Sequence, residues 1–530
     1  MQRVFLLCLL ALFISGIAEG QKRVRLKHAD ISRGKVINGE RVDWVIGNVV
    51  FTQNQTTIYC DSAQIFKAEN SVEAYGRVRI TEGDSVTATG QRLSYDGNTK
   101  IAKLRRNVVF TKLATATLYT DFLDYYRMKN EARYFNGGRL VDSVNTLTSQ
   151  KGYYNLVTNL ASFKTKVVGI NPDYTLTSDT LQYNSQTKVI YFRDSTHIVD
   201  KDGQTAVYQS GFYDTNQKKS NINQGTIETP TYRLTGEKYF LDDLRKFYRA
   251  KTNVVMISKE ENMTIYGDDG YYDKANGISK VYGNAWIAKV ADDGDTLFLS
   301  ADTLVSVESN DPRKKRLLAY RNVKIFKQDL QGTADSLVYM QADSVLEFFK
   351  TPALWTSGNQ MTADTIRVAL ANKKIDKIYL LSNSFVISQD TLQNFNQIKG
   401  RKMTAQFKGP DVQYVNVEGN GESLYYVLQE EEQDLDSVIL KITFMAGMNK
   451  MVCSNMRINF VDGQVNNVSA YVQPDASFIP PHELKREDTR LKGFVWRSKE
   501  RPLREDVVKK TPGNPPPAGP PPEKGESQRQ

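Results

Sequence analysis

One position, filled mostly by aspartate, recurs along this chain of 530 residues, and within each of two runs its successive occurrences stand 29–34 residues apart. The aspartates occur at Asp30, Asp61, Asp121 and Asp179, and again at Asp268, Asp302, Asp335 and Asp364. Gly90 and Gln150 occupy the same position in the intervening repeats. One carboxylate per repeat could form a ladder that binds cations, or each could accept hydrogen bonds from backbone N–H groups beside a strand bend. Because glycine and glutamine also fill this position, the structural role is favoured.

Few other residues suggest catalysis. The histidines His28, His197 and His482 are far apart in sequence, and carboxylate pairs such as Asp242-Asp243 lie in turn-like segments. The motifs of serine hydrolases (Gly-x-Ser-x-Gly), zinc proteases (His-Glu-x-x-His) and phosphate-binding loops do not occur. We therefore expect a protein that is not an enzyme and that uses no metal or other cofactor.

The repeating unit that carries the aspartates consists of two short phrases. The first is Gly47-Asn48-Val49-Val50-Phe51, which returns as Gly76-Arg77-Val78-Arg79-Ile80. The second is Leu118-Tyr119-Thr120-Asp121-Phe122-Leu123-Asp124-Tyr125, which returns at 176–183 and 331–339. Apolar and polar residues alternate in these phrases, as they do in a strand with one buried face. A period of about 30 residues indicates stacked β repeats, about twelve to fourteen of them, that bury a shared core.

The same alternation identifies the residues that should line the interior. Every second residue of a strand points to the same side, and in these phrases that residue is apolar. The candidates are Val49, Phe51, Val78, Ile80, Val108, Phe110 and Leu118. We expect them to form one continuous apolar surface that either packs on itself or contacts a ligand.

The two ends of the chain differ from the repeats. At the N-terminus, Arg3 precedes an apolar run that is too short to cross a bilayer and ends in small residues, which is the pattern of a secretory signal peptide. We divide the chain into this signal peptide (1–20), an N-terminal β region (21–185), continuing β repeats (186–475) and a basic, proline-rich tail (476–530). The composition of the tail predicts disorder.

Composition narrows the possible partners. The formal charge of the chain is +10. Binding of nucleic acid is not expected, because the charges are dispersed and the chain has an export signal. Polyanions outside the cytoplasm, such as the phosphates of lipopolysaccharide, fit a mildly basic protein better. Cys60 and Cys453 are far apart in sequence, and we expect them to be buried and free rather than paired in a disulfide.

The export signal, the repeats and the phrases Gly-Asn-Val-x-Phe and Leu-x-Ala/Ser-Asp-x-Leu-x-Tyr together resemble the OstA-like family. The resemblance is strongest over residues 25–185. The family includes the periplasmic lipopolysaccharide-transport protein of the LptA type and the N-terminal domain of the LptD translocon. The long repeat array, without the ten-residue amphipathic strands of a membrane barrel, resembles a Bacteroidetes-type member.

The resemblance implies an all-β fold, an extended β-jellyroll or β-solenoid-like open folded sheet. Its apolar interior would bind lipopolysaccharide or lipid A in the periplasm, in association with the outer membrane, and the candidate residues of the first repeats would contact the acyl chains. Other lipopolysaccharide-transport proteins would join it end to end by strand addition. The alternative is a structural or adhesive β-solenoid with a dry core. A polysaccharide-processing β-helix enzyme is a third interpretation, but it needs clustered ionisable groups that the sequence does not supply.

Overall fold

The computed structural model describes residues 23–509, except 38, 113–115, 231, 261, 291–293, 373, 410, 436–437 and 462–463. Strands hold 73% of the chain, so the prediction of an all-β fold is confirmed. The predicted signal peptide (1–20) and the proline-rich stretch 515–522 lie outside the described residues. None of the helices in the described part of the chain has the length and apolar character to cross a membrane.

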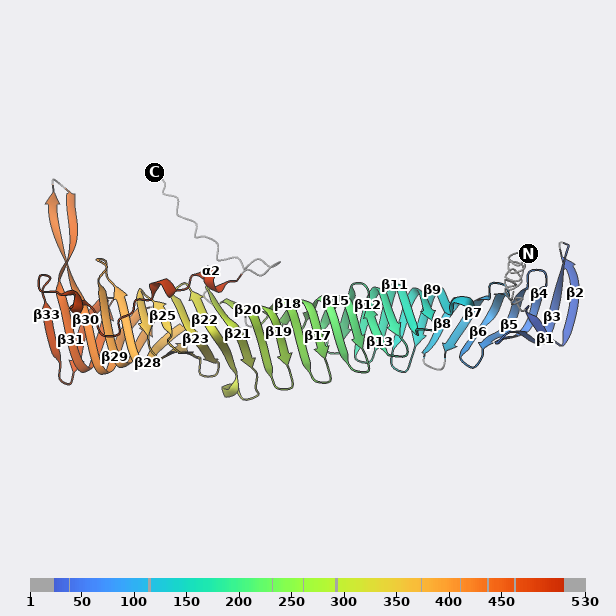
Figure 1. The fold of residues 1–530 in the computed structure, drawn as a ribbon, viewed down its shortest axis with the longest axis horizontal. Helices are drawn as coiled ribbons and strands as arrows, with labels where there is room; N and C mark the ends of the chain where they lie inside the picture. Colours follow the sequence, from blue (N-terminus) through green and yellow to red (C-terminus); the bar gives the residue numbers. More distant parts are fainter. Residues whose placement is uncertain are drawn as a thin grey trace, which may run out of the picture. The chain divides into compact units, whose positions relative to one another are not determined.

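The chain divides into two compact units, Met1–Ile222 and Asn223–Gln530. In the first unit, consecutive antiparallel strands lie side by side (Figure 1). These strands are β1 (Arg25–His28), β2 (Ile31–Ile37), β3 (Glu40–Gln53), β4 (Thr56–Phe66), β5 (Ser71–Glu82), β6 (Val86–Asp96), β7 (Ile101–Lys112), β8 (Ala116–Tyr126), β9 (Glu131–Val141), β10 (Thr146–Asn155), β11 (Leu160–Asn171), β12 (Tyr174–Asn184), β13 (Val189–Phe192), β14 (Thr196–Asp200) and β15 (Thr205–Asp214). A 3-10 turn, η2 (Arg127–Lys129), joins β8 to β9, and β16 (Lys219–Glu228) contains the division between the units.

Each long strand of the first unit bends near its middle. In β5 the residues Gly76 and Arg77 have positive φ angles of 73° and 35°, and the pairing with β6 shifts register between Tyr75 and Val78. Such a bulge bends a strand, and glycine adopts positive φ at little cost. The bulge recurs at Gly47-Asn48 and Arg106-Asn107, which explains the first sequence phrase. It divides β5 into a first arm (71–75) and a second arm (78–82), and we use these names for the paired halves of the neighbouring strands.

The recurring aspartates lie opposite the bulges. The carboxylate of Asp121 accepts a hydrogen bond from the backbone N–H of Asn107 at 2.9 Å, and Asp30 accepts one from the side chain of Asn48 at 3.1 Å. In the second unit the equivalent pairs are Asp268–Asn284, Asp302–Asn322 and Asp364–Asn383. The aspartates therefore lie at the bends, where Asp121 accepts from a backbone N–H as predicted and the others named accept from asparagine side chains instead. Among the described residues, no cluster of three or more His, Cys, Asp or Glu is arranged to hold a metal ion.

The second unit is also a series of antiparallel strands (Figure 1). They are β17 (Tyr232–Asp242), β18 (Phe247–Ser258), β19 (Met263–Asp273), β20 (Ile278–Val290), β21 (Thr296–Val307), β22 (Arg316–Lys327), β23 (Leu330–Met340), β24 (Val345–Phe349), β25 (Ala353–Thr356), β26 (Asn359–Thr362), β27 (Thr365–Ala371), β28 (Lys374–Gln389), β29 (Phe395–Lys408), β30 (Asp411–Leu435), β31 (Val438–Val461), β32 (Gln464–Tyr471) and β33 (Asp475–Ile479). Its short helical elements are η3 (Pro312–Lys314), η4 (Arg486–Thr489), η5 (Ser498–Glu500) and α2 (Arg504–Val507).

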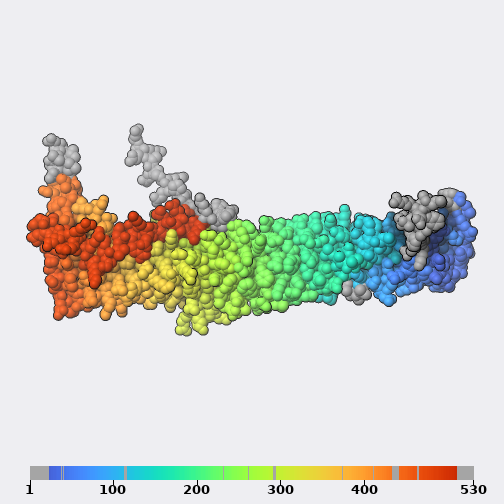
Figure 2. Space-filling view, in the orientation of Figure 1, coloured from blue at the N-terminus to red at the C-terminus, as the bar shows by residue number. Residues whose placement is uncertain are grey.

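Residues 480–508, which we call the C-terminal strap, lie across the strands of the second unit. Figure 2 shows this segment in red over the orange and yellow strands. The strap covers the face of the sheet opposite to the core: in β20, Ile287 belongs to the main core cluster, whereas the adjacent Trp286 packs against Val507 of the strap. At the other end of the strap, Leu491 packs against Phe385. Both faces of the sheet are thus buried where the strap passes.

Three glutamines hold the backbone and one side chain of the strap. Gln360 donates to the carbonyl of Val495 at 2.8 Å and accepts from the N–H of Arg497 at 2.6 Å. Gln397 makes an equivalent pair of hydrogen bonds with the strap backbone, and Gln331 accepts from the Arg501 guanidinium at 2.9 Å. All three glutamines are buried and stand at the same position of successive repeats. A buried amide needs such partners, so the glutamines and the strap depend on each other.

The prediction of a disordered tail from residue 476 is therefore wrong for residues 476–508. Residues 476–479 belong to β33, and the strap that follows is ordered by its contacts with the sheet. The prediction relied on the proline and charge content of this segment and gave too little weight to its apolar residues. Leu491, Phe494 and Trp496 anchor the segment in an apolar cluster with the sheet. Residues 510–530, which contain most of the prolines of the predicted tail, lie outside the described residues.

We predict that a chain ending at Ile479 has a less stable second unit than the full chain. Removing the strap uncovers Trp286 and Phe385 and breaks the hydrogen bonds that the three glutamines make with it. Fully burying a side chain such as Leu491 or Val507 contributes about 1.5–3 kcal/mol, so the melting temperature should fall by several degrees, measured by circular dichroism. A chain ending at Lys509 keeps the strap and should unfold like the full chain. Equal melting temperatures for all three would show that the strap contributes nothing to stability.

Candidate functional site: the apolar interior and its polar seam

All seven residues predicted to line the interior lie together on the inner face of the second arms. Each of them is only 1–3% exposed. The seven residues are Val49, Phe51, Val78, Ile80, Val108, Phe110 and Leu118. They come from β3, β5, β7 and β8, which are joined in order by the ladders of β4 and β6. The sequence alternation thus identified one side of a continuous apolar interior.

The other side of the interior was missed by the sequence analysis. It is formed by the inner faces of the first arms, where the buried residues include Ala74, Leu93, Tyr95, Leu104, Leu123 and Tyr125. The rings of Phe110 and Tyr125 meet edge to face across the two arms, with centroids 5.8 Å apart. The recurring Leu-x-Tyr of the second phrase, as in Leu123-Asp124-Tyr125, was the available signal, because its apolar residues alternate on the opposite arm.

The free ends of the two arms meet along a line that we call the seam. The turns at the ends of the second arms, such as 82–86, contact the turns at the ends of the first arms, such as 126–131. The contacts join Gln53 to Gly97, Glu82 to Arg127, Lys112 to Leu156 and Asp142 to Lys188. Each joins residues 44–46 positions apart, which is about one and a half repeats. The seam is therefore staggered, and polar side chains bridge it once per repeat.

The most extensive bridge is centred on Glu82. Its carboxylate accepts two hydrogen bonds from the guanidinium of Arg127, at 2.8 and 2.9 Å, and a third from the hydroxyl of Tyr125 at 2.9 Å. Arg127 also donates to the hydroxyl of Tyr95 at 2.9 Å. The Arg127 side chain is only 6% exposed. Two parallel N–H···O bonds make an arginine–carboxylate pair strong and geometrically specific.

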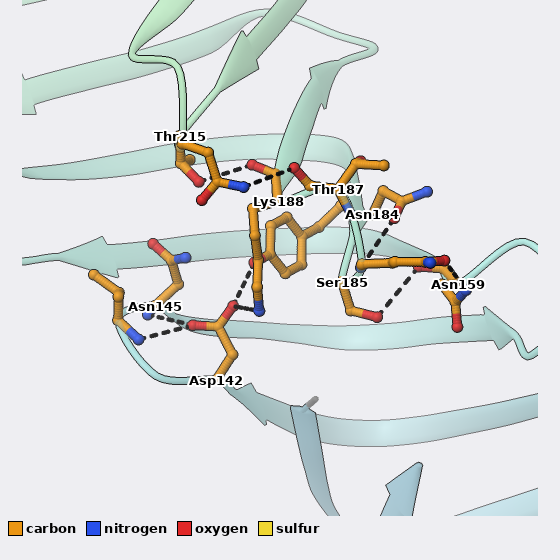
Figure 3. Close-up of polar contacts among 12 residues, drawn as sticks. Asp142, Asn145, Asn159, Asn184, Ser185, Thr187, Lys188 and Thr215 are labelled. Atoms are coloured by element: carbon orange, nitrogen blue, oxygen red, sulfur yellow. Dashed lines mark hydrogen bonds and ion pairs between the residues drawn. The ribbon is translucent and has the colours of Figure 1, made fainter. Parts of the chain in front are cut away.

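A second bridge is centred on Asp142, between β9 and β10 (Figure 3). Asp142 accepts hydrogen bonds from the N–H groups of Val144 and Asn145 in its own turn, at 2.9 and 2.7 Å. Across the seam it pairs with Lys188 at 3.1 Å and with the hydroxyl of Tyr183. The carboxylate is 1% exposed. We call the Glu82–Arg127 and Asp142–Lys188 pairs the two latches.

Both latch carboxylates are held in their charged form. Burial alone would raise the pKa of Glu82, but the hydrogen bonds and charge of Arg127 and the hydroxyl of Tyr125 keep that pKa below its ordinary value. The pKa of Asp142 is lowered in the same way against burial, by Tyr183, by two backbone N–H groups and by Lys188. Away from the seam, burial raises the pKa of the free thiol of Cys60 to about 12. Cys60 and Cys453 are both buried and free, as predicted.

The N-terminal part of the chain matches a known family. Residues 21–179 match the model of the family described as OstA-like protein, and this range contains the seven lining residues. The resemblance to the OstA-like family that was inferred from the repeat phrases is therefore confirmed over these residues.

Solved structures include a similar protein with a stated role. It is LptH of Pseudomonas aeruginosa, described as the LptA-homologous periplasmic component of the conserved lipopolysaccharide transport device. The match has 13% sequence identity and a TM-score of 0.14, and it covers 26% of this chain and 79% of LptH. The comparison with curated proteins gave no match.

We predict that Arg127→Met destabilises the first unit, because it leaves the Glu82 carboxylate partly buried without its cation. Breaking a buried pair on one side costs about 3–5 kcal/mol, and the partial exposure of Glu82 places the expected loss at the lower end. Urea unfolding followed by tyrosine fluorescence measures the loss. The matched control is Arg77→Met, since Arg77 pairs with Asp61 on the surface with 88% of its side chain exposed, and exposed pairs contribute little. Equal losses in the two variants would contradict a stabilising role for the latch.

The latches also predict a dependence on pH. Since the pKa values of Glu82 and Asp142 are lowered in the folded protein, their stabilisation is complete above their unfolded pKa values. It is lost as the pH falls through the lowered values. The urea midpoint should therefore fall between about pH 5 and about pH 2. The double variant Glu82→Gln, Asp142→Asn should show a smaller fall, and an unchanged fall would mean that other carboxylates are responsible.

Proposed function

We propose that this protein carries lipopolysaccharide or lipid A across the periplasm for outer-membrane assembly, without catalysis. The acyl chains would be shielded in the apolar interior of the first unit. The observation that supports this most directly is the continuous apolar lining of the OstA-like region, contributed by both arms of every long strand. Each methylene removed from water contributes about 0.8 kcal/mol, so partition alone supplies the driving force for a multi-chain lipid.

The terminal strands support the proposal that partners join by strand addition. Among the described residues, β1 and β2 pair with β3 alone, and β32 and β33 pair with β31 alone. Side chains on these strands expose apolar surface, including Leu26, Ile31, Val468 and Phe478. An unpaired strand edge is a template for a strand of another chain. We propose that other lipopolysaccharide-transport proteins dock at these edges.

One observation favours the alternative, a structural β-solenoid with a dry core. The lining residues pack against one another, as Phe110 does against Tyr125, and the core cluster of the second unit is continuous from Ala285 to Ile458. A permanently packed interior needs no ligand. The two functions therefore differ in whether the side chains of the first unit ever contact lipid.

Photo-crosslinking in cells tests the proposed function. A photoreactive amino acid replaces Leu118, which is 3% exposed on the inner face of β8, and the control replaces its neighbour Tyr119, which is 39% exposed on the outer face. We expect lipid to be captured at Leu118 and not at Tyr119, with a second inner probe at Phe110 giving the same result. A folded protein whose inner and outer probes capture equally little lipid would exclude transport and leave the dry solenoid.

A further inference from the structure

The interior of the first unit is closed in this structure. The seven lining residues are at most 3% exposed, and the two arms touch at Phe110 and Tyr125. An acyl chain can reach the lining only after some part of the wall opens. The wall offers three routes, namely between neighbouring strands, through an end of the unit, and through the seam.

Opening between neighbouring strands breaks a backbone ladder. The pairing of β7 with β8, for example, extends from Ile101 and Tyr126 at one end to Lys112 and Ala116 at the other. Every pair of adjacent strands from β3 to β12 is joined by a ladder of this kind. A buried backbone group that loses its partner costs about 1–3 kcal/mol, and many would be lost at once. This route is the most costly of the three.

Threading from an end is costly for a different reason. The ligand is an amphiphile, and its charged head would have to follow the acyl chains through the apolar interior. Burying an unpaired charge is strongly unfavourable. The chains would also have to displace the packed residues of each repeat in turn. A route along the side of the unit avoids both costs, because the head stays in water while the chains insert.

The seam is such a route. The contacts across it that join Gln53, Glu82, Lys112 and Asp142 to the opposite row are each made by a side chain. When they separate, the charged groups of the latches pass into water, where they are solvated. The bends remain intact, because they are held on the opposite side of the interior by the aspartates such as Asp121.

We propose that the seam is the gate of the first unit, through which acyl chains of an anionic lipid insert sideways, and that the latches hold it shut in the absence of lipid. This inference rests on the proposed function. It assigns Glu82, Arg127, Asp142 and Lys188 a role in admitting lipid in addition to their role in stability.

A crosslink across the seam tests the gate. In the mature full-length chain with Cys60→Ala and Cys453→Ala, the pair Glu82→Cys, Arg127→Cys is joined by a short bis-maleimide. A disulfide is unsuitable, because it requires Cα atoms within about 7 Å, and long side chains bridge this pair. The control is Glu69→Cys, Asn98→Cys. These residues lie on neighbouring turns of the same row, where the Asn98 side chain donates to the carbonyl of Glu69 at 2.9 Å, so this crosslink does not span the seam.

The measurement is the association rate of lipid A that carries a fluorescent acyl chain. We expect the seam crosslink to slow association by about tenfold or more, whereas the control crosslink should leave it within about twofold of the unlinked protein. If seam-linked and unlinked proteins take up lipid at the same rate, the gate is excluded and the proposed function stands. If the unlinked protein binds no lipid, the proposed function and the gate are both overturned.

A second pair keeps the test decisive if the first variant folds poorly. Asp142→Cys, Lys188→Cys spans the same seam at the other latch, and circular dichroism selects the variants that retain the strand signal. A complementary variant, Glu82→Gln with Arg127→Gln, removes the charge of one latch without a crosslink. It should accelerate association several-fold, and an unchanged or slower rate would contradict the role of the latch.

Discussion

A sheet with one apolar face must bury that face. In the first unit the sheet does so by folding over, so that the apolar faces of its two arms pack against each other. Every second long strand folds back where two consecutive residues adopt positive φ, as Gly76 and Arg77 do in β5. That conformation leaves backbone N–H groups pointing away from the ladder, and a carboxylate such as Asp121 satisfies one of them. The interior, its two linings and its seam all follow from this bend, repeated about every 30 residues.

A folded sheet leaves two rows of turns at its open side, and their chemistry decides what the interior can do. In the first unit, polar side chains bridge the two rows once per repeat. Each bridge joins residues that are 44–46 positions apart in sequence. In the second unit, the strap buries the outer face of the sheet and is held by glutamines at equivalent repeat positions. The seam of the first unit can separate without breaking a backbone ladder. The strap of the second unit instead adds a further buried layer to the sheet.

The parts of this structure that could be predicted from sequence are those set by local periodicity. Val49 and Phe51 are buried because alternation in a strand fixes the face to which they point. The partners across the seam could not be predicted, because the separation of Glu82 and Arg127 depends on how the strands tilt when the sheet folds, and no local pattern encodes it. The strap was missed although a signal was present: Gln331, Gln360 and Gln397 are amides at one repeat position, and a buried amide needs hydrogen-bond partners, some of which the strap supplies.

A closed, well-packed interior is compatible with transport when the free energies are compared. An acyl chain with about a dozen methylenes gains about 10 kcal/mol on leaving water, whereas releasing one buried ion pair costs about 3–5 kcal/mol at most when one partner stays buried. Both partners of a latch reach water when the seam opens, so the actual cost is smaller. The arms lose contact with each other, but the acyl chain replaces that contact with apolar surface of the same kind. The net gain is therefore close to the burial of the lipid itself, so the cost of opening the latches would not prevent an acyl chain from entering in the proposed transport.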